Sequence, residues 1–266
     1  MIDEPRLFAL ATLVTRGEGP LRAAEFAFPP GASMAQVLGI LRQGRPVQRR
    51  VTIPEGLTAR QIAAILGRTE GLTGELPVFA EGVVLPETYA YAWGDSRAAL
   101  FRRAEAAMLQ ALSEAWAARA ANLPLATPRE ALILASIVER ETSVPEERPR
   151  IAAVFLNRLR ANMPLQSDPT VAYAAADGAL LDRPLSRADL DRDHPFNTYK
   201  VRGLPPAPIA APGVAALRAV TRPATTEELY FVADGTGGHA FARTLEEHNR
   251  NVARWREIER RRGAGL

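Results

Sequence analysis

The sequence predicts an α+β fold with a small strand–helix subdomain at residues 1–80 and a mainly helical domain with a β-hairpin at residues 81–266. Three observations favour this fold: a strand–turn–helix repeat near the start, a long amphipathic helix in the middle, and two alternating runs around a glycine-rich turn near the end. With 266 residues, of which 47% are apolar, the chain is large enough to bury a core.

The composition excludes several classes of function. The chain has no Cys, which removes disulfide frameworks, thiolate zinc sites and cysteine nucleophiles. The three His lack metal-ligand spacing and no glycine motif would cradle a phosphate, so we expect no metal, cofactor or nucleotide. The net charge is only +3, and Lys200 is the only lysine. This predicts mild attraction to anionic polymers and no binding of nucleic acid.

No window of the sequence approaches the roughly 18 apolar residues that span a bilayer. The first residues also lack the cationic and apolar regions of a signal peptide. We therefore expect a soluble chain as given, and the same pattern fits the soluble part of an anchored protein.

The first elements are a helix over residues 6–15 and an internal repeat. Residues 28–41 and 53–66 match at a constant offset of 25 positions. In each copy an alternating run (25–28 and 49–53) ends at a proline, and a cap residue opens an amphipathic helix. Each copy therefore predicts a strand, a turn and a helix.

The central helix carries two glutamates at the margins of its apolar face. Residues 127–130 (TPRE) are typical of a helix start, with a capping box and proline at the first helical position. At 100° per residue, Glu139 and Glu141 flank the apolar stripe on opposite sides and Arg140 faces solvent. A carboxyl group at the edge of an apolar face is desolvated, which raises its pKa toward the range of a general acid.

The residues alone leave both glutamates open to a structural interpretation. Glu139 also fits a boundary residue whose carboxylate reaches water, and Glu141 fits an ion-pair partner of Arg148 or Arg150. Geometry does not choose between these roles.

Further elements follow along the chain. We expect a second helix from about Pro149, with Asn157 beside its inner face, and a third helix over 170–176 that is capped by Asp168. Gln166 cannot titrate, so its functional role would be a hydrogen bond to a polar ligand.

The last third predicts a loop, a hairpin and a final helix. Residues 197–213 are rich in Pro and Gly and predict an ordered loop beside a cleft. Residues 228–233 and 239–242 predict a hairpin, and Thr244 caps a last helix whose basic end (260–262) is expected to face solvent.

Several motifs together resemble the endolytic murein transglycosylases, the MltG or YceG-like family. They are ASIVERET at 135–142, ER at 147–148, VFLNRL at 154–159, MPLQSDPT at 163–170, NTY at 197–199, GLPP at 203–206, the strand at 229–234 with GGHAF at 237–241, and the segments 51–58 and 85–89. The segment 51–63 is also similar to the opening of LysM glycan-binding modules.

The resemblance implies a peptidoglycan lyase with a LysM-like subdomain (1–80) and a catalytic domain (81–266). Such enzymes cut the β-1,4 bond between N-acetylmuramic acid and N-acetylglucosamine and leave a 1,6-anhydro end. It further implies the periplasmic side of the inner membrane, an N-terminal anchor that this chain lacks, and peptidoglycan synthases as partners.

The resemblance also implies site residues. The first glutamate of the pair, Glu139, matches the catalytic residue of the family. The residues expected to bind sugar or to support the transition state are Gln166, Asn157, Asn197, Tyr199, Asp168 and Glu141.

One acidic residue suffices for this chemistry. Hydrolysing glycosidases use two carboxylates, whereas an attack by the sugar's own C6 hydroxyl group needs only one group that gives and then takes a proton. Two alternatives stay open: a muramidase-type hydrolase with Asp168 as the second carboxylate, and a non-catalytic scaffold that binds peptidoglycan.

Overall fold

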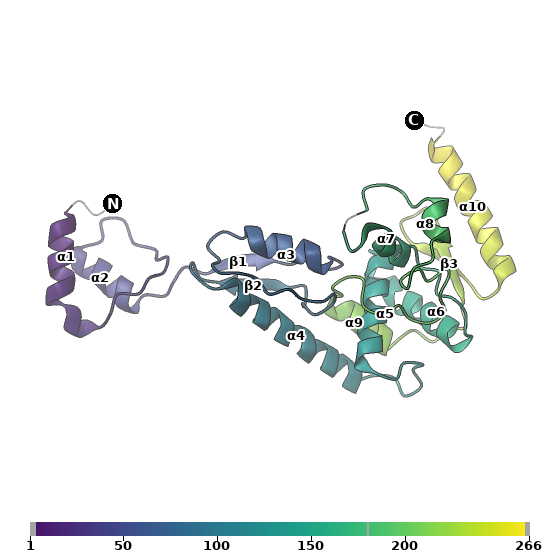
Figure 1. Ribbon diagram of the computed structural model, residues 1–266, viewed down its shortest axis with the longest axis horizontal. Helices are drawn as coiled ribbons and strands as arrows, with labels where there is room; N and C mark the ends of the chain where they lie inside the picture. Colours follow the sequence, from purple (N-terminus) through teal and green to yellow (C-terminus); the bar gives the residue numbers. More distant parts are fainter. Residues whose placement is uncertain (1–3, 180, 264–266) are drawn as a thin grey trace. The chain divides into compact units, whose positions relative to one another are not determined.

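The computed structural model describes residues 4–179 and 181–263 as a mixed helical and stranded protein (Figure 1), as the α+β prediction required. The elements are α1 (Pro5–Val14), α2 (Met34–Gln43), β1 (Arg49–Thr52), α3 (Ala59–Arg68), β2 (Thr88–Tyr91), α4 (Arg97–Ala117), α5 (Pro128–Glu141), α6 (Arg148–Arg160), α7 (Asp168–Ala176), α8 (Arg187–Asp191), α9 (Val214–Thr221), β3 (Tyr230–Ala233), β4 (His239–Ala242) and α10 (Leu245–Gly263).

The chain forms two compact units that interleave along the sequence. The first unit takes in the chain up to Thr52 together with Leu66–Pro77 and Thr88–Phe101. The second takes in Ile53–Ile65, Val78–Glu87 and the chain from Arg102 onward. Segments on both sides of residue 80 contribute to each unit, and the division into a LysM-like subdomain and a catalytic domain stays a prediction.

The first unit contains a two-stranded antiparallel sheet. In its register Arg49 lies opposite Tyr91, and Thr52 opposite Thr88. The predicted strand over 49–53 is thus confirmed as β1, whereas the predicted strand over 25–28 is wrong. That segment has no ladder partner among the described residues, and the Glu25 carbonyl accepts a single hydrogen bond, from the amide of Val47 (2.8 Å). A strand needs repeated backbone hydrogen bonds to a neighbouring strand, and this segment makes one such bond to residue 47.

Both helices of the repeat begin as predicted. Ser33 caps α2, and its hydroxyl group and the Gln36 amide close a reciprocal capping box. Thr58 and Gln61 make the same pair of bonds at the start of α3. The two glutamines therefore satisfy backbone donors that a helix start otherwise leaves unpaired.

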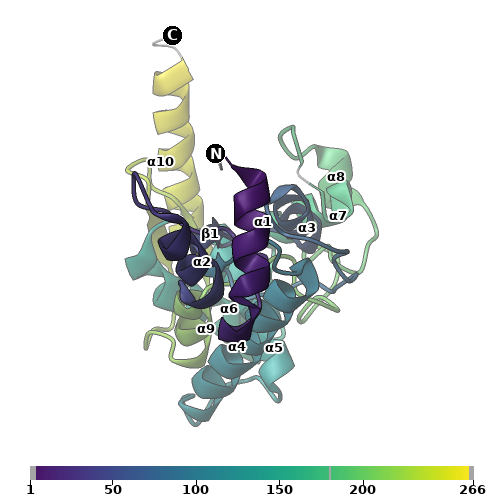
Figure 2. The same cartoon turned by 90° about the vertical axis from the view of Figure 1, so that its left-hand side faces the viewer.

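The core of the second unit lies where α5, α6 and α9 pack together, as Figures 1 and 2 both show. Thr127 caps α5 and accepts a hydrogen bond from the Glu130 amide (3.2 Å). Fully buried side chains of α5, α6 and α9 meet there: Leu134, Ile137, Val138, Ile151, Phe155 and Leu217. This packing holds the end of α5, and with it both glutamates.

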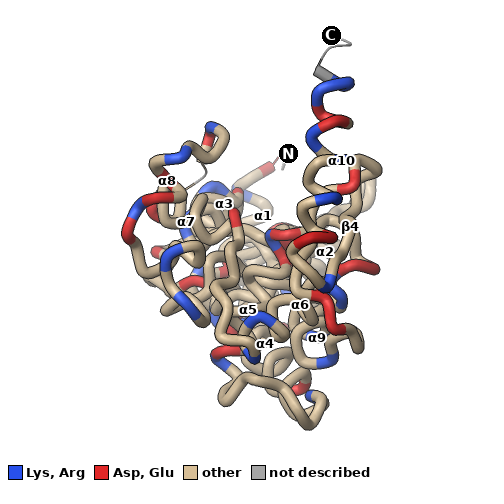
Figure 3. The backbone as a smooth tube through the Cα atoms, turned by 90° about the vertical axis from the view of Figure 1, so that its right-hand side faces the viewer, with Lys and Arg blue, Asp and Glu red and all other residues tan. Residues whose placement is uncertain are grey.

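The remaining elements of the second unit surround the end of α5. The predicted hairpin is confirmed, with β3 and β4 antiparallel. The predicted last helix is α10, which carries both cationic and anionic residues along its length (Figure 3).

The prediction that Asp168 caps the third helix is wrong. That helix, α7, begins at Asp168, and the N-cap position is held by Ser167. No helix in the described part of the chain is long and apolar enough to cross a membrane.

Candidate functional site

Glu139 is held in a buried ion pair at the end of α5. Its side chain is only 3% exposed, and one carboxylate oxygen accepts a hydrogen bond from Arg148 Nη2 (2.9 Å). The other accepts the amide of Gly213 (2.9 Å), which is the N-cap residue of α9. Burial raises the pKa of Glu139, while the Gly213 amide and the Arg148 charge oppose that rise. Glu139 therefore joins α5 to α6 and α9.

In this geometry the Glu139 carboxylate reaches neither water nor a described cavity. Its carboxylate oxygens are taken by a guanidinium and a backbone amide, and it lines neither of the two cavities described below. Arg148 also contacts Glu55 (3.4 Å), so two carboxylates share that cation.

Glu141 has a different environment, although it lies only two residues further along α5. Its carboxylate accepts a short hydrogen bond from the Ser167 hydroxyl group, and it makes none of the described ion pairs. Burial raises its pKa to about 7, and the nearby charge of Asp168 acts in the same direction. Arg148, the cation that the sequence offered to Glu141, pairs with Glu139 instead.

Glu141 lies on the wall of a cavity of about 390 Å³. Gln166, Asp168 and Tyr199, three of the sequence-predicted site residues, line the same cavity. Helix α5 supplies the glutamate, the turn before α7 supplies Gln166, the first residue of α7 is Asp168, and the loop after α8 supplies Tyr199. Four side chains from three stretches of the chain thus line one space.

Asp168 and Tyr199 form a hydrogen-bonded pair in this wall. The Tyr199 hydroxyl group donates to Asp168 Oδ1 (2.6 Å). Burial and this bond to a carboxylate both raise the pKa of Tyr199, so the phenol stays protonated. Because Asp168 does not cap α7, its carboxylate is free for this contact.

The loop that carries Ser167 is braced from the segment around Thr198. The Ser167 amide donates to the Thr198 hydroxyl group (2.9 Å), and the Gln166 amide donates to the Thr198 carbonyl (3.0 Å). Gln166 itself adopts a left-handed backbone conformation with φ of 54°. These bonds fix the serine that contacts Glu141.

Asn157 and Asn197 lie outside the described lining of the cavity, and both use their amides on the backbone. Asn157 Nδ2 donates to the carbonyls of Thr226 (2.8 Å) and Glu228 (3.0 Å). Asn197 is fully buried, and its Nδ2 donates to carbonyls that include that of Arg192 (2.8 Å). Both asparagines stabilise loops, which differs from the expected contact with sugar.

The sequence reasoning missed three residues of the cavity wall: Arg158, His239 and His248. Arg158 is buried, and its guanidinium holds Gln166 Oε1 (3.1 Å). His239 Nδ1 pairs with Glu147 (2.6 Å). The signal for Arg158 was its place beside the inner face of the second helix, and His239 lies in the GGHAF motif. His248 had no local signal, because it reaches the cavity only through the packing of α10.

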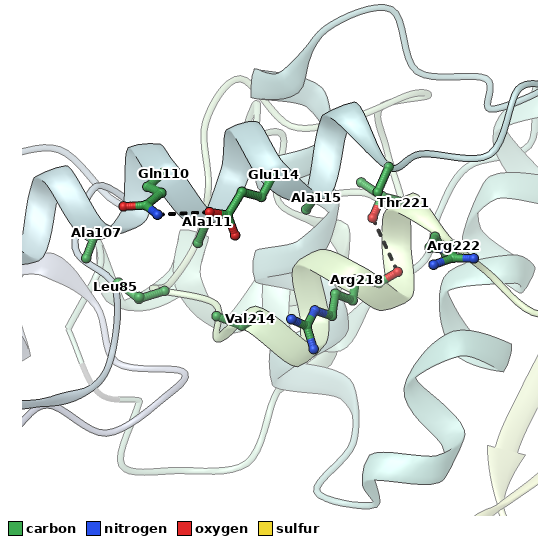
Figure 4. A pocket seen from close by; sticks show the side chains of 11 residues that line it. Leu85, Ala107, Gln110, Ala111, Glu114, Ala115, Val214, Arg218, Thr221 and Arg222 are labelled. Carbon is green, nitrogen blue, oxygen red and sulfur yellow. Dashed lines mark hydrogen bonds between the residues drawn. The ribbon is translucent and has the colours of Figure 1, made fainter.

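A second cavity of about 650 Å³ lies between α4 and α9 (Figure 4). Alanines of α4 form part of its lining, and its charged side chains are exposed. Gln110 donates to the exposed carboxylate of Glu114 (2.9 Å), and Arg218 projects from α9. This cavity is larger, but it holds no desolvated acid, so the chemistry is better placed at Glu141.

No group of three or more potential metal ligands occurs among the residues that the structure describes. A desolvated carboxyl group that faces a cavity with amide, phenol and imidazole groups is typical of an acid–base site for a polar substrate.

Comparison with known proteins agrees with this class. The family described as the YceG-like family matches residues 1–254, so the chain belongs to that family. The resemblance found in the sequence is thereby confirmed.

Named relatives have one description in common. Over 119 residues the chain is 48% identical to the "Endolytic murein transglycosylase" of Bacillus subtilis (strain 168), covering 45% of this chain and 32% of that protein. It is 32% identical over 283 residues to the protein of the same name from Streptococcus pneumoniae serotype 2 (strain D39), covering 88% of this chain and 50% of that protein. The chain thus spans half or less of the length of these relatives.

A solved structure has a similar fold. The crystal structure of a yceG-like protein from Listeria monocytogenes aligns with a TM-score of 0.61 and 26% identity. The alignment covers 93% of this chain and 90% of that one.

Proposed function

We propose that this chain is a lytic transglycosylase that cuts the β-1,4 bond between N-acetylmuramic acid and N-acetylglucosamine in peptidoglycan and leaves a 1,6-anhydro end. Membership of the YceG-like family and the name of the relatives support the reaction class. The observation that carries the proposal is Glu141: one carboxyl group with a pKa of about 7 on the wall of a polar cavity.

Glu141 would act first as a general acid and then as a general base. Its protonated carboxyl group donates to the glycosidic oxygen as the bond from that oxygen to the muramyl C1 breaks. The resulting carboxylate then takes the proton of the C6 hydroxyl group as its oxygen bonds to C1. Glu141 ends protonated again and no water is consumed. A pKa near 7 suits both steps, because each protonation state is accessible at neutral pH.

We assign this role to Glu141 in place of Glu139. Residues two apart on a helix are rotated by about 200° around its axis. The two carboxyl groups therefore point in nearly opposite directions and cannot serve one site. Glu139 is turned toward Arg148 and Gly213, where a proton donor could not reach a sugar. Glu141 is turned toward the cavity.

The neighbouring groups would hold the substrate and tune the acid. The Ser167 hydroxyl group, bonded to Glu141, stabilises the carboxylate formed after the first step. The amide of Gln166 and the phenol of Tyr199 offer hydrogen bonds to sugar hydroxyl and acetamido groups.

Product analysis tests the proposal. Purified peptidoglycan is digested with the chain and the soluble muropeptides are weighed by mass spectrometry. Anhydro ends, which are lighter than reducing ends by one water, are the expected result. Intact polymer would favour the scaffold alternative.

A muramidase-type hydrolase is the second candidate, and one observation favours it: Asp168 lines the same cavity as Glu141. Its carboxylate could activate a water molecule or attack C1. The bond from Tyr199 weakens it in either role, since a carboxylate that accepts a hydrogen bond is a poorer base and nucleophile. Reducing ends in the digestion would support this candidate.

Family membership also supports further proposals about the setting of the reaction. We propose that the strand–helix segment around β1 and α3 is a LysM-like glycan contact. We also propose that the chain works on the periplasmic side of the inner membrane, through an anchor, near peptidoglycan synthases. Co-purification of the full-length protein with membranes and with synthases tests this setting.

A further inference from the structure

Arg158 is a buried cation with no carboxylate partner among the described residues. The residue is only 7% exposed. Its Nε donates to the carbonyl of Leu229 (2.6 Å), and its Nη1 donates to the carbonyls of Pro164 (3.1 Å) and Leu165 (2.9 Å) and to Gln166 Oε1 (3.1 Å). All four acceptors are neutral. Burial lowers the pKa of Arg158 and the charge of Glu141 opposes that fall, so the guanidinium is compensated only while Glu141 is ionised.

The remaining nitrogen, Nη2, is open to the cavity. It has no acceptor among the described residues. It is also absent from the buried side-chain atoms that lack a partner in that part of the chain, which are Arg148 Nε and His248 Nδ1. Nη2 therefore touches accessible space, and Arg158 lines the Glu141 cavity.

His248 contributes a second unsatisfied polar atom to the same wall. Its buried Nδ1 has no hydrogen-bond partner. The Tyr230 ring links the two residues: His248 stacks on it with centroids 5.1 Å apart, and the Arg158 guanidinium lies 5.1 Å from its centroid. Burial and the charge of Arg158 lower the pKa of His248, which keeps the imidazole neutral, so it adds no second cation to this wall.

We propose that Arg158, through Nη2, forms a carboxylate-binding subsite of the Glu141 cavity. A guanidinium N–H suits a carboxylate better than a neutral carbonyl, because charge-assisted bonds are the stronger ones. This inference rests on the proposed function, since the ionised acids of a peptidoglycan strand belong to its muramyl residues. They are the lactyl acid of a bare strand or the acids of its stem peptide. The subsite would fix the muramyl side of the cut.

Binding without turnover tests the subsite separately from the lyase reaction. The Glu141→Gln chain is titrated by calorimetry with three muramyl tetrasaccharides. One bears free lactyl acids, one bears the lactyl amides, and one bears stem peptides with free acids. We expect at least one of the two acidic ligands to bind about tenfold more tightly than the amide. Whichever does so identifies the source of the carboxylate. Equal binding of all three, or no binding, would overturn the subsite.

Variants test the assigned atoms. On the Glu141→Gln background, Arg158→Lys, which lacks Nη2, is expected to reduce the tenfold preference to threefold or less. Arg254→Gln removes a charge from an exposed position on α10 and should leave the preference unchanged. Arg158 also braces a loop, so circular dichroism must show a folded chain. If Arg158→Lys does not fold, the titrations of the Glu141→Gln chain are repeated at about 1 M salt, and a tenfold preference that survives there overturns the subsite. If the unmodified chain releases no anhydro products from peptidoglycan, that result counts against the lyase proposal, whatever these titrations show.

Discussion

The two glutamates at the end of α5 lie in opposite environments, although they are separated by one residue. Burial raises the pKa of both. Glu139 is then compensated by a cation and a backbone amide, whereas Glu141 has a neutral hydroxyl partner and a cavity in front of it. Burial therefore does not mark a catalytic acid by itself. The difference lies in how the counter-charge acts, through a hydrogen-bonded guanidinium at Glu139 but only through space from Arg158 at Glu141, and in whether a substrate can reach the group.

The largest expected effect is a loss of cleavage activity that distinguishes Glu141 from Glu139. Glu141→Gln keeps the shape and the bond from Ser167 but removes the transferable proton. Loss of a general acid–base group is expected to lower the rate on the order of 10² to 10⁴-fold. Release of anhydro-muropeptides measures it, and Glu146→Gln, at an exposed position outside the described lining of the cavity, is the matched control. Full activity of Glu141→Gln would refute the assignment.

The same substitution at the other glutamate, Glu139, should lower the stability of the fold. Glu139→Gln leaves the side chain of Arg148, which is 11% exposed, with only Glu55 at 3.4 Å. Breaking a buried pair on one side costs roughly 3–5 kcal/mol, and the remaining carboxylate places this variant near the lower figure. Urea unfolding measures the loss, with the more exposed Glu55→Gln as a milder control.

The same variant has a catalytic readout. Assayed well below its melting temperature, Glu139→Gln should retain cleavage within a few-fold of the unmodified chain. A variant that melts normally but no longer cleaves would return the acid–base role to Glu139.

The pH dependence of stability gives a third contrast. Folded Glu141 keeps its proton up to a pKa of about 7, whereas in the unfolded chain it titrates at about its ordinary value of 4.5. The folded state therefore binds more protons between these values, and its stability falls as pH rises from about 4.5 to about 7. The shift corresponds to about 3 kcal/mol. In Glu141→Gln this contribution is absent, so its free energy of unfolding should fall less over that window. A parallel pH dependence in both chains would contradict the raised pKa.

Much of the fold was predictable because its signals are local. The cap at Thr127, the hairpin around residues 234–238 and the cap at Thr244 depend on residues close in sequence, and the structure has all three elements. The expected strand over 25–28 failed because a strand needs a partner, and pairing is not local information.

The site was predictable as a set of segments but not as a set of contacts. The motifs around Glu139, Gln166 and Tyr199 do come together in the second unit. What the sequence could not show is which glutamate receives Arg148, because the helical wheel places both at equal margins. It also could not show that the side-chain amide of Asn197 donates its hydrogen bonds to backbone carbonyls. Such choices depend on which loop packs against which face.

The smallest expected effect is a pair of opposite shifts in the pH profile. Ser167 lowers the pKa of Glu141 by a hydrogen bond to its carboxylate, and Asp168 raises it by like charge. Cleavage requires the protonated acid, so activity falls as pH rises through that pKa. Ser167→Ala should therefore move the alkaline limb of the rate profile to higher pH, and Asp168→Asn should move it to lower pH. Rates of anhydro-muropeptide release between pH 5 and 9 measure both shifts. Because the two changes act on one carboxyl group from opposite sides, a shift in the same direction would show that another group titrates. A loss on the order of 10²-fold in Asp168→Asn at every pH would instead make Asp168 the second carboxylate of a hydrolase.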